Sequence, residues 1–138
     1  MYSSIVIAAA LFNEGATTRA ALQKAKSLLD KGGKITLVHV IDEVPGYVAA
    51  SIPKEHMTAR RREVEEQLEA IAAEASGLNV QSVIREGQPS ASILGAAKEA
   101  DADLIMIASH KPGLSDYFIG STAARIVRHA PVSVLVTR

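Results

Sequence analysis

Five short apolar runs, rich in valine and isoleucine, alternate along the chain with segments of helical periodicity. The runs span residues 4–9, 34–40, 79–85, 103–109 and 133–138. Each run has the length of a strand, and nearly continuous apolar sequence is typical of strands that are covered on both faces. The runs therefore predict five strands of a parallel sheet.

The segments between these runs predict four helices. Apolar residues recur at three- and four-residue steps from Ala21 to Leu29 and again from Val64 to Ala75. A third helix is expected to start in QPSAS, residues 88–92, and a fourth to run from Ser121 to about His129. Because strand and helix alternate throughout, we predict one α/β domain over residues 1–138, with a parallel sheet and right-handed crossovers.

Two segments stand outside this alternation. The stretch DKGGK, residues 30–34, supplies a stop after the first helix. Residues 41–57, IDEVPGYVAASIPKEHM, form a long insert with little clear periodicity. Loops of this length are commonly functional, but a plain surface excursion explains the insert equally well, and both interpretations remain open.

Composition narrows the classes of partner. The 138 residues carry 15 Lys and Arg against 15 Asp and Glu, so no basic field attracts nucleic acid or an anionic membrane. Cysteine is absent, and the apolar run at residues 5–12 is too short to cross a bilayer and lacks the pattern of a signal peptide. We expect a cytoplasmic protein without a nucleic-acid or membrane partner. The four histidines are scattered, so no metal site is predicted.

A ligand crevice is expected where the winding of the sheet reverses, between the first and fourth strands. The residues at the two strand ends are Ala8, Ala9 and Ala10 on one side and Ala108, Ser109 and His110 on the other. Their small side chains leave room for a flat ligand. Gly120, Ser121 and Thr122 add backbone amides and hydroxyls at the start of a helix, which favours an anion. The same residues also suit an ordinary helix cap without a ligand, and this alternative stays open.

The second half of the chain resembles a known family. The stretch ADADLIMIASHKPGLSDYFIGSTAARIVRHAPVSVLVTR resembles the C-terminal signature of the universal stress protein (UspA-like) family, and REGQPSASILGAAKEADADLIMIASH is similar to the third strand, third helix and fourth strand of that family. The resemblance implies a three-layer, Rossmann-like domain of the adenine nucleotide alpha hydrolase type. It also implies a five-stranded parallel sheet in the order 3-2-1-4-5 and dimers that pair through the last strand.

Many members of this family bind ATP through Gly-x-x-Gly, nine intervening residues, then Gly and Ser or Thr. In this chain Ala108 and Lys111 stand at the positions of the two glycines, and eight residues separate Lys111 from Gly120. The form ASHKPGLSDYFIGST resembles a variant subgroup that is similar to nucleotide-binding members. Where the first strand of the family commonly ends in an adenosine-contacting Asp, this chain has Ala10, which offers only its backbone.

The resemblance assigns site residues position by position. The adenine side would be lined by Ala8, Ala9, Ala10 and Val40, the sugar and phosphate side by Ala108, Ser109, His110, Lys111 and Gly113, and the phosphate anchor would be Gly120, Ser121 and Thr122. The ligand would be ATP or another adenine nucleotide, with Mg²⁺ neutralising its phosphates. Lys111 would contact a phosphate or, alternatively, be a solvated residue of a Pro-Gly turn.

The last apolar run predicts a self-association surface. It holds Val132, Ser133, Val134, Leu135 and Val136. An apolar edge strand without charge or proline invites aggregation unless it is paired, and pairing with a second copy in a homodimer removes that hazard.

Three functions are consistent with these patterns. The first is a dimeric stress-response protein that binds an adenine nucleotide and uses its occupancy as a signal. The second is a nucleotide-free dimeric interaction module, and the third is a hydrolase or transferase acting on a phosphate compound. No residue set is equipped for efficient catalysis, so we assign no catalytic residue and expect at most slow ATP hydrolysis.

Overall fold

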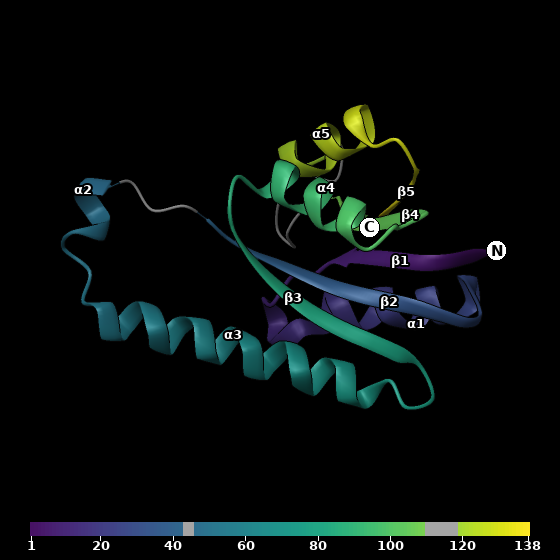
Figure 1. Ribbon diagram of the computed structural model, residues 1–138, viewed down its shortest axis with the longest axis horizontal. Helices are drawn as coiled ribbons and strands as arrows, with labels where there is room; N and C mark the ends of the chain where they lie inside the picture. The colour runs from purple at the N-terminus through teal and green to yellow at the C-terminus, as the bar shows by residue number, and fades with distance from the viewer. Residues whose placement is uncertain (43–45, 110–118) are drawn as a thin grey trace.

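A computed structural model describes residues 1–42, 46–109 and 119–138 of the chain. Its sheet has five parallel strands in the order β3-β2-β1-β4-β5, as the sequence predicted. The strands are β1 (Tyr2–Ala8), β2 (Leu29–Asp42), β3 (Asn79–Gly87), β4 (Leu104–Ala108) and β5 (Ser133–Thr137). Helices lie on both sides of this sheet, in three layers (Figure 1).

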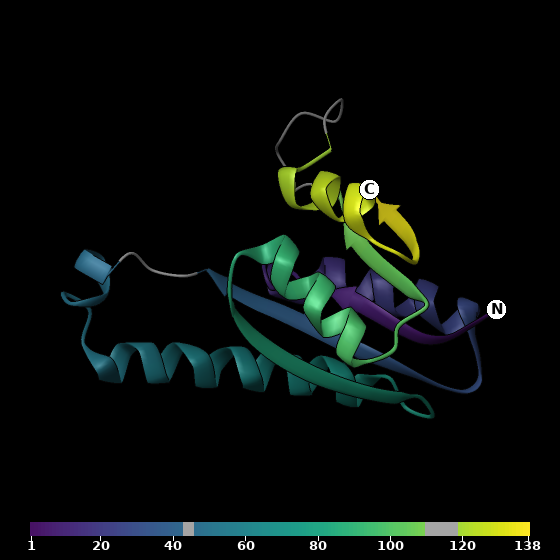
Figure 2. The ribbon, with the colours of Figure 1, turned by 45° about the horizontal axis from the view of Figure 1, so that its top comes forward.

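Two helices cover each face of the sheet. Side chains of α1 (Ala16–Leu28) and α3 (Lys54–Glu74) pack into one core cluster. Side chains of α4 (Pro89–Glu99) and α5 (Ser121–His129) pack into a second cluster on the opposite face. Figure 2 shows α4 and α5 on their side of the sheet from a second direction.

The alternation of side chains along the strands explains why the strand sequences are apolar throughout. In β1, Ile5 and Ile7 face the cluster beneath α1 and α3, whereas Val6 faces the cluster beneath α4 and α5. All three are at most 1% exposed. Leu104 and Ile105 of β4 divide between the two clusters in the same way. Because both faces are buried, consecutive positions must all be apolar.

The winding reverses between β1 and β4. The chain leaves β1 for α1 on one face of the sheet, and it leaves β4 for α5 on the other. The two connections therefore diverge from neighbouring strands, which is the arrangement in which a ligand crevice is expected at the carboxyl ends. This is the switch point that the sequence predicted.

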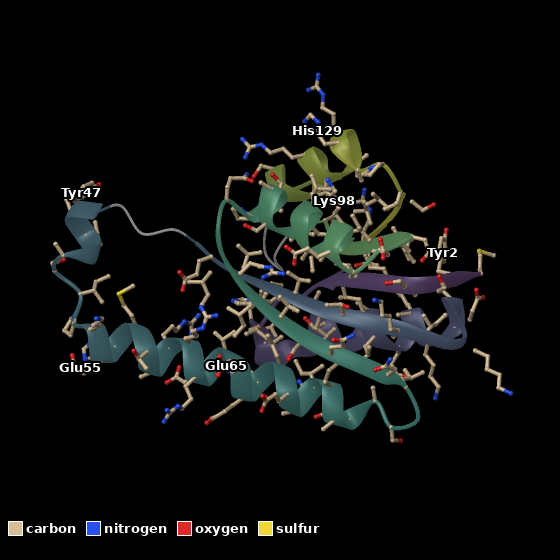
Figure 3. All side chains as sticks on the ribbon, viewed as in Figure 1. Tyr2, Tyr47, Glu55, Glu65, Lys98 and His129 are labelled. Carbon is tan, nitrogen blue, oxygen red and sulfur yellow. The ribbon has the colours of Figure 1, made fainter. Side chains whose placement is uncertain are left out.

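The segment 41–57 differs from the long insert expected there. β2 extends to Asp42, a short helix α2 spans Gly46–Ala49, and α3 begins at Lys54. The first buried residue of α3 is Val64, so its first ten residues form helix without a core-facing stripe that the sequence pattern could reveal. Helix α2 and the first ten residues of α3 together form an arm. Figure 3 shows Tyr47 at the tip of this arm, far from the sheet, and its side chain is 83% exposed.

Two further boundaries differ from the prediction. The strand predicted at residues 34–40 begins earlier, because β2 starts at Leu29, directly after α1 ends at Leu28 next to the DKGGK stretch. The pairing with β1 shifts from Tyr2↔Leu29 to Ser4↔Lys34, so the extra residues form an irregularity within the strand, and Gly32 adopts a φ of 81° there. At the other end of the chain, Val132 lies outside β5.

Candidate functional site

The carboxyl end of β1 is tied to β2 through both backbone groups of Ala9. Its amide donates to the carbonyl of Val38 at 2.8 Å, the last rung of the β1–β2 ladder. Its carbonyl lies 3.2 Å from Nδ1 of His39. A carbonyl oxygen can only accept, so this contact requires the proton on Nδ1. His39 thus contacts the end of β1. Sequence reasoning missed this contact, because the sequence does not show which way the ring points.

The backbone of Ala10 is held by a second residue that the sequence did not reveal. The amide of Ala10 donates to Oγ1 of Thr18 at 2.8 Å, and the same hydroxyl donates to the carbonyl of Ala10 at 2.8 Å. Thr18 lies in the first turn of α1 and is 1% exposed. The backbone that Ala10 was expected to offer a ligand is therefore engaged within the protein, although the carbonyl retains a second lone pair.

Val40 lies in the part of β2 that extends beyond the end of β1. β1 pairs with β2 only as far as Ala8↔Val38, whereas β2 pairs with β3 as far as Asp42↔Gly87. The carbonyl of Val38 faces β1, and in a strand every second residue turns its backbone groups to the same side. The N–H and C=O of Val40 therefore face the β1 side of β2, beyond the last residue that pairs with β1.

Backbone hydrogen bonds tie the residue after β4 to β5 and to the start of α5. The amide of Ser109 donates to the carbonyl of Thr137 at 2.8 Å, and the carbonyl of Ser109 accepts from Gly120 at 2.5 Å. Ser109 is 2% exposed, and Ala108 before it is half-buried. The chain thus returns at Gly120 to the point where it left β4. The predicted site residues His110, Lys111 and Gly113 lie outside the described residues.

The helix α5 starts directly after Gly120. Gly120 is the N-cap residue, with φ −64° and ψ 156°, and its carbonyl accepts from the amide of Ala124 at 2.9 Å. No side chain among the described residues caps the helix. Ser121 is exposed and occupies the first helical position, so it is not the capping residue, and Thr122 beside it is half-buried. The amides of the first turn lack the i−4 carbonyl of a helix interior, and the helix dipole adds partial positive charge.

Arg19, Glu74 and Asp103 have shifted pKa values. A hydrogen bond with Glu74 raises the pKa of Arg19, and the same bond lowers the pKa of Glu74. Burial alone would raise the pKa of Asp103, but hydrogen bonds from Ser3 and Ser4 outweigh it, so that pKa is lowered. Within residues 1–42, 46–109 and 119–138, no group of three or more His, Asp or Glu side chains could hold a metal ion. None of the helices in that part of the chain is long and apolar enough to cross a bilayer.

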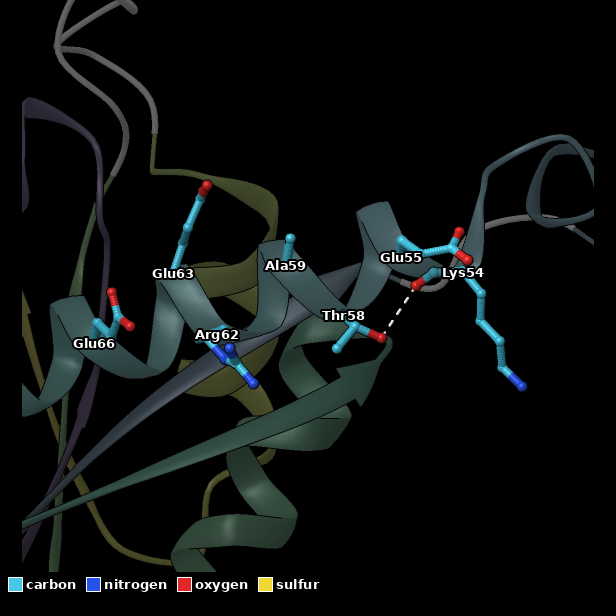
Figure 4. A pocket seen from close by; sticks show the side chains of 7 residues that line it. All are labelled: Lys54, Glu55, Thr58, Ala59, Arg62, Glu63 and Glu66. Carbon is cyan, nitrogen blue, oxygen red and sulfur yellow. Dashed lines mark hydrogen bonds between the residues drawn. The ribbon is translucent and has the colours of Figure 1, made fainter.

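Two surface hollows lie elsewhere. One follows the exposed part of α3, and Figure 4 shows that its lining side chains all come from this helix: Lys54, Glu55, Thr58, Ala59, Arg62, Glu63 and Glu66. A smaller one lies between the β1–α1 turn and α3, lined by Leu11, Glu14, Gly15, Arg19, Gln67, Ala70 and Ile71. Neither contains a residue predicted for the ligand site. Because one helix supplies the whole lining of the first hollow, it lacks the convergent walls of a binding pocket.

Known proteins resemble the whole chain. Universal stress protein G of Salmonella typhimurium is 29% identical over 146 residues, which cover 100% of both chains. The solved structure of the hypothetical protein MJ0577 superposes with a TM-score of 0.81 at 26% identity, covering 99% of this chain and 96% of the other. A universal stress protein from Archaeoglobus fulgidus in complex with dAMP has a TM-score of 0.66 at 20% identity, covering 99% and 98%. Another universal stress protein, in complex with cAMP, has a TM-score of 0.62 at 17% identity, covering 99% and 97%.

The family match itself extends from the first residue to the last. The Universal stress protein family matches residues 1–138, which include every strand and helix described above. The resemblance noted in the sequence is thereby confirmed, and the chain belongs to the Universal stress protein family.

Proposed function

We propose that the protein is a cytoplasmic, dimeric stress-response protein that binds an adenine nucleotide, with ATP as the first candidate, in the crevice between β1 and β4. Family membership and the two nucleotide complexes among the structural neighbours support the ligand class. The observation that carries the proposal is the helix start at Gly120, where no described side chain caps the helix and the amide of Gly120 donates to the carbonyl of Ser109 at the end of β4.

The phosphates would bind at this helix start. The first-turn amides of Ser121, Thr122 and Ala123 are donors without a helical partner, and a hydroxyl accompanies two of them. No acidic side chain lies in the first turn to repel an anion. Backbone amides combined with a positive helix end are a general phosphate-binding arrangement.

The base would bind at the overhanging end of β2. The outward N–H and C=O of Val40 supply one donor and one acceptor, which match the N1 acceptor and the N6 amino donor of adenine. The methyl side chains of Ala8, Ala9 and Ala10 would leave space for the flat ring. Ala108 and Ser109 would line the opposite wall, together with His110, Lys111 and Gly113 as the sequence predicts.

Magnesium would arrive with the nucleotide. The described residues offer no cluster of metal-binding side chains, so the protein does not provide a dedicated Mg²⁺ cage there. In this proposal the ion is coordinated by phosphate oxygens and water, which is common for Mg²⁺. The described residues also include no pair of groups that we assign to catalysis, and the proposed role is binding.

The dimer would form through β5. Ser109 donates to Thr137, so Thr137 and Leu135 turn their backbone groups toward β4, while those of Val134 and Val136 point outward. This outer edge has no neighbouring strand within the described chain. Pairing with the same edge of a second copy would satisfy these groups and cover the apolar strand.

Isothermal titration with Mg²⁺-ATP tests the nucleotide proposal. We expect saturable binding at ligand concentrations up to millimolar, weaker binding of AMP, and loss of most of the affinity in Gly120→Asp, which places a carboxylate at the phosphate anchor. Absence of heat, together with an unchanged melting temperature at millimolar ATP, would overturn the proposal.

A nucleotide-free dimeric interaction module is the second candidate. It is favoured by one observation, the hydrogen bonds of Thr18 to both the amide and the carbonyl of Ala10. In that case the crevice would be a packed part of the scaffold, and dimerisation through β5 would persist while ATP changed neither stability nor oligomeric state.

A further inference from the structure

The connection from β1 to α1 contains a left-handed turn. Asn13, Glu14 and Gly15 have φ values of 51°, 56° and 79°. Glycine adopts this conformation freely, and asparagine tolerates it, but a glutamate does so only at a cost in free energy. Such backbone persists where surrounding contacts hold it in place. The contacts around residues 13–15 therefore show which side chains hold the turn in this conformation.

A single guanidinium joins this turn to two helices. Arg19 of α1 donates through Nη1 to the backbone carbonyl of Glu14. The same side chain donates through Nε and Nη2 to the two carboxylate oxygens of Glu74 on α3, at 2.7 and 3.1 Å. This two-pronged contact fixes the plane of the guanidinium, because both donors meet one carboxylate. Glu74 thus orients Arg19, and Arg19 holds the carbonyl at the centre of the turn.

The turn is also seated on α3 by packing. A Cβ atom added to Gly15 would lie 2.8 Å from Cδ1 of Ile71 and 3.1 Å from Nη1 of Arg19. Ile71 is 1% exposed and belongs to the core cluster beneath α1 and α3. A larger residue at position 15 would require Ile71 to shift within the core, so the turn packs closely against α3.

Thr18 and Arg19 hold two points of the same connection. Thr18 forms hydrogen bonds with the amide and carbonyl of Ala10, and its neighbour Arg19 donates a hydrogen bond to the carbonyl of Glu14. The segment between these points follows the end of β1, at the edge of the sheet where the nucleotide is proposed to bind. We infer that Arg19 is a positioning residue, held by Glu74, that fixes this segment of the proposed nucleotide site. The inference rests on the proposed function for its ligand, but the contacts stand without it.

Because the Arg19–Glu74 ion pair is exposed, its effect on the turn can be distinguished from an effect on the overall stability of the protein. The side chains of Arg19 and Glu74 are 39% and 54% exposed, and ion pairs at such positions contribute little to overall stability. Arg61 provides a matched control. It is 44% exposed and also forms ion pairs, with Glu65 on its own helix and Glu86 on β3, but it does not touch the turn.

The experiment compares Arg19→Gln and Glu74→Gln with Arg61→Gln. Amide hydrogen exchange in the ligand-free protein follows Gly15, whose N–H donates to the carbonyl of Phe12 at 3.0 Å. We expect exchange at Gly15 to accelerate about tenfold or more in Arg19→Gln and in Glu74→Gln, while the urea unfolding midpoints of all three variants stay close together. Titration with Mg²⁺-ATP is expected to show a Kd raised about three- to tenfold in Arg19→Gln and Glu74→Gln and unchanged in Arg61→Gln.

The two readouts separate the inference from the proposed function. If the wild-type protein binds no ATP, the proposed function fails, and Gly15 exchange alone decides whether Arg19 holds the turn. If ATP binds but Arg19→Gln and Arg61→Gln behave alike in exchange and in affinity, Arg19 is an ordinary surface residue and the inference is overturned. A change in Arg19→Gln that Glu74→Gln does not share would overturn the role given to Glu74.

Discussion

The hydroxyl of Thr18 occupies both backbone polar groups of Ala10, accepting from its amide and donating to its carbonyl at 2.8 Å each. The contact crosses from the first turn of α1 to the residue where the chain leaves the sheet. Ala10 has no polar side chain, so this buried hydroxyl substitutes for the partners that the end of a strand loses. It sets the path of the chain and removes the backbone of Ala10 from the groups most readily offered to a ligand.

Replacing Thr18 by valine keeps the shape and removes the hydroxyl. We expect Thr18→Val to lower the free energy of unfolding by about 1–3 kcal/mol, because the amide and carbonyl of Ala10 lose a buried partner. Thr18→Ser keeps the hydroxyl and is expected to lose less. Urea unfolding measures both. A valine variant as stable as the wild type would contradict the structural role of this hydroxyl.

Ala10→Asp restores the residue that the family resemblance implies at the end of β1. A charge-assisted hydrogen bond to the adenosine part of the ligand contributes about 1.5–3 kcal/mol, so affinity is expected to rise by about ten- to a hundredfold. Titration with adenosine as well as ATP checks this prediction, because adenosine has no phosphates for the new carboxylate to repel. Unchanged affinity for both ligands would place the base elsewhere.

Two variants at Gly120 separate a helix cap from an anion site. Gly120 has no side chain to cap α5, so Gly120→Asn and Gly120→Asp are both expected to change stability only slightly, and in the stabilising direction, by a few tenths of a kcal/mol. Only the aspartate adds negative charge where the phosphates would bind. We therefore expect Gly120→Asp to weaken ATP binding much more than Gly120→Asn, measured by titration beside thermal unfolding. Equal affinities would argue against a phosphate at this helix start.

The sequence predicted the sheet well because its signals are local. Every strand is buried on two faces, so residues such as Ile5, Val6 and Ile7 are all apolar and mark a strand by themselves. The arm was missed for the opposite reason. From Lys54 to Glu63 the helix α3 has no buried residue, so these positions carry no apolar stripe, and residues 54–57 were assigned to the insert at 41–57.

The candidate site was predicted only in part. Ala9 and Gly120 were named from position, because parallel strand ends and helix starts meet at one edge of a sheet. Thr18 and His39 were not, because their roles depend on where a side chain points once α1 and β2 have packed. The overhang of β2 past β1 at Val40 is likewise a matter of register, which one sequence does not reveal.

Asp103 fastens the amino end of β1 to the turn before β4. Its carboxylate accepts from the amides of Ser3 and Ser4 at 2.9 and 3.0 Å, and these bonds lower its pKa despite the opposing effect of burial. A lowered folded pKa gives stability that is full above the ordinary value of 3.8 and is lost as the pH falls through the folded pKa. We expect Asp103→Asn to cost about 1 kcal/mol near neutral pH, after allowance for solvent screening, and progressively less in acid.

Asp101 is the matched control for this measurement. It lies in the same turn, its φ of 50° is one that asparagine tolerates, and its side chain makes no hydrogen bond within the described chain. Unfolding free energies of the two variants from pH 7 to pH 3 are compared with the wild type. A loss for Asp103→Asn that is independent of pH, or equal to the loss for Asp101→Asn, would contradict the assignment.

The outer edge of β5 offers a test of dimerisation that spares the fold. The N–H of Val136 points away from β4, so Val136→Pro removes an outward donor without removing a bond of the β4–β5 ladder. Val136→Ala is the control, since it trims the side chain and keeps the N–H. Light scattering after gel filtration is expected to show a dimer for the wild type and for Val136→Ala, and a folded monomer for Val136→Pro. A Val136→Pro variant that stays dimeric would move the interface away from this edge, because antiparallel pairing across a two-fold axis depends on the outward groups of this short strand.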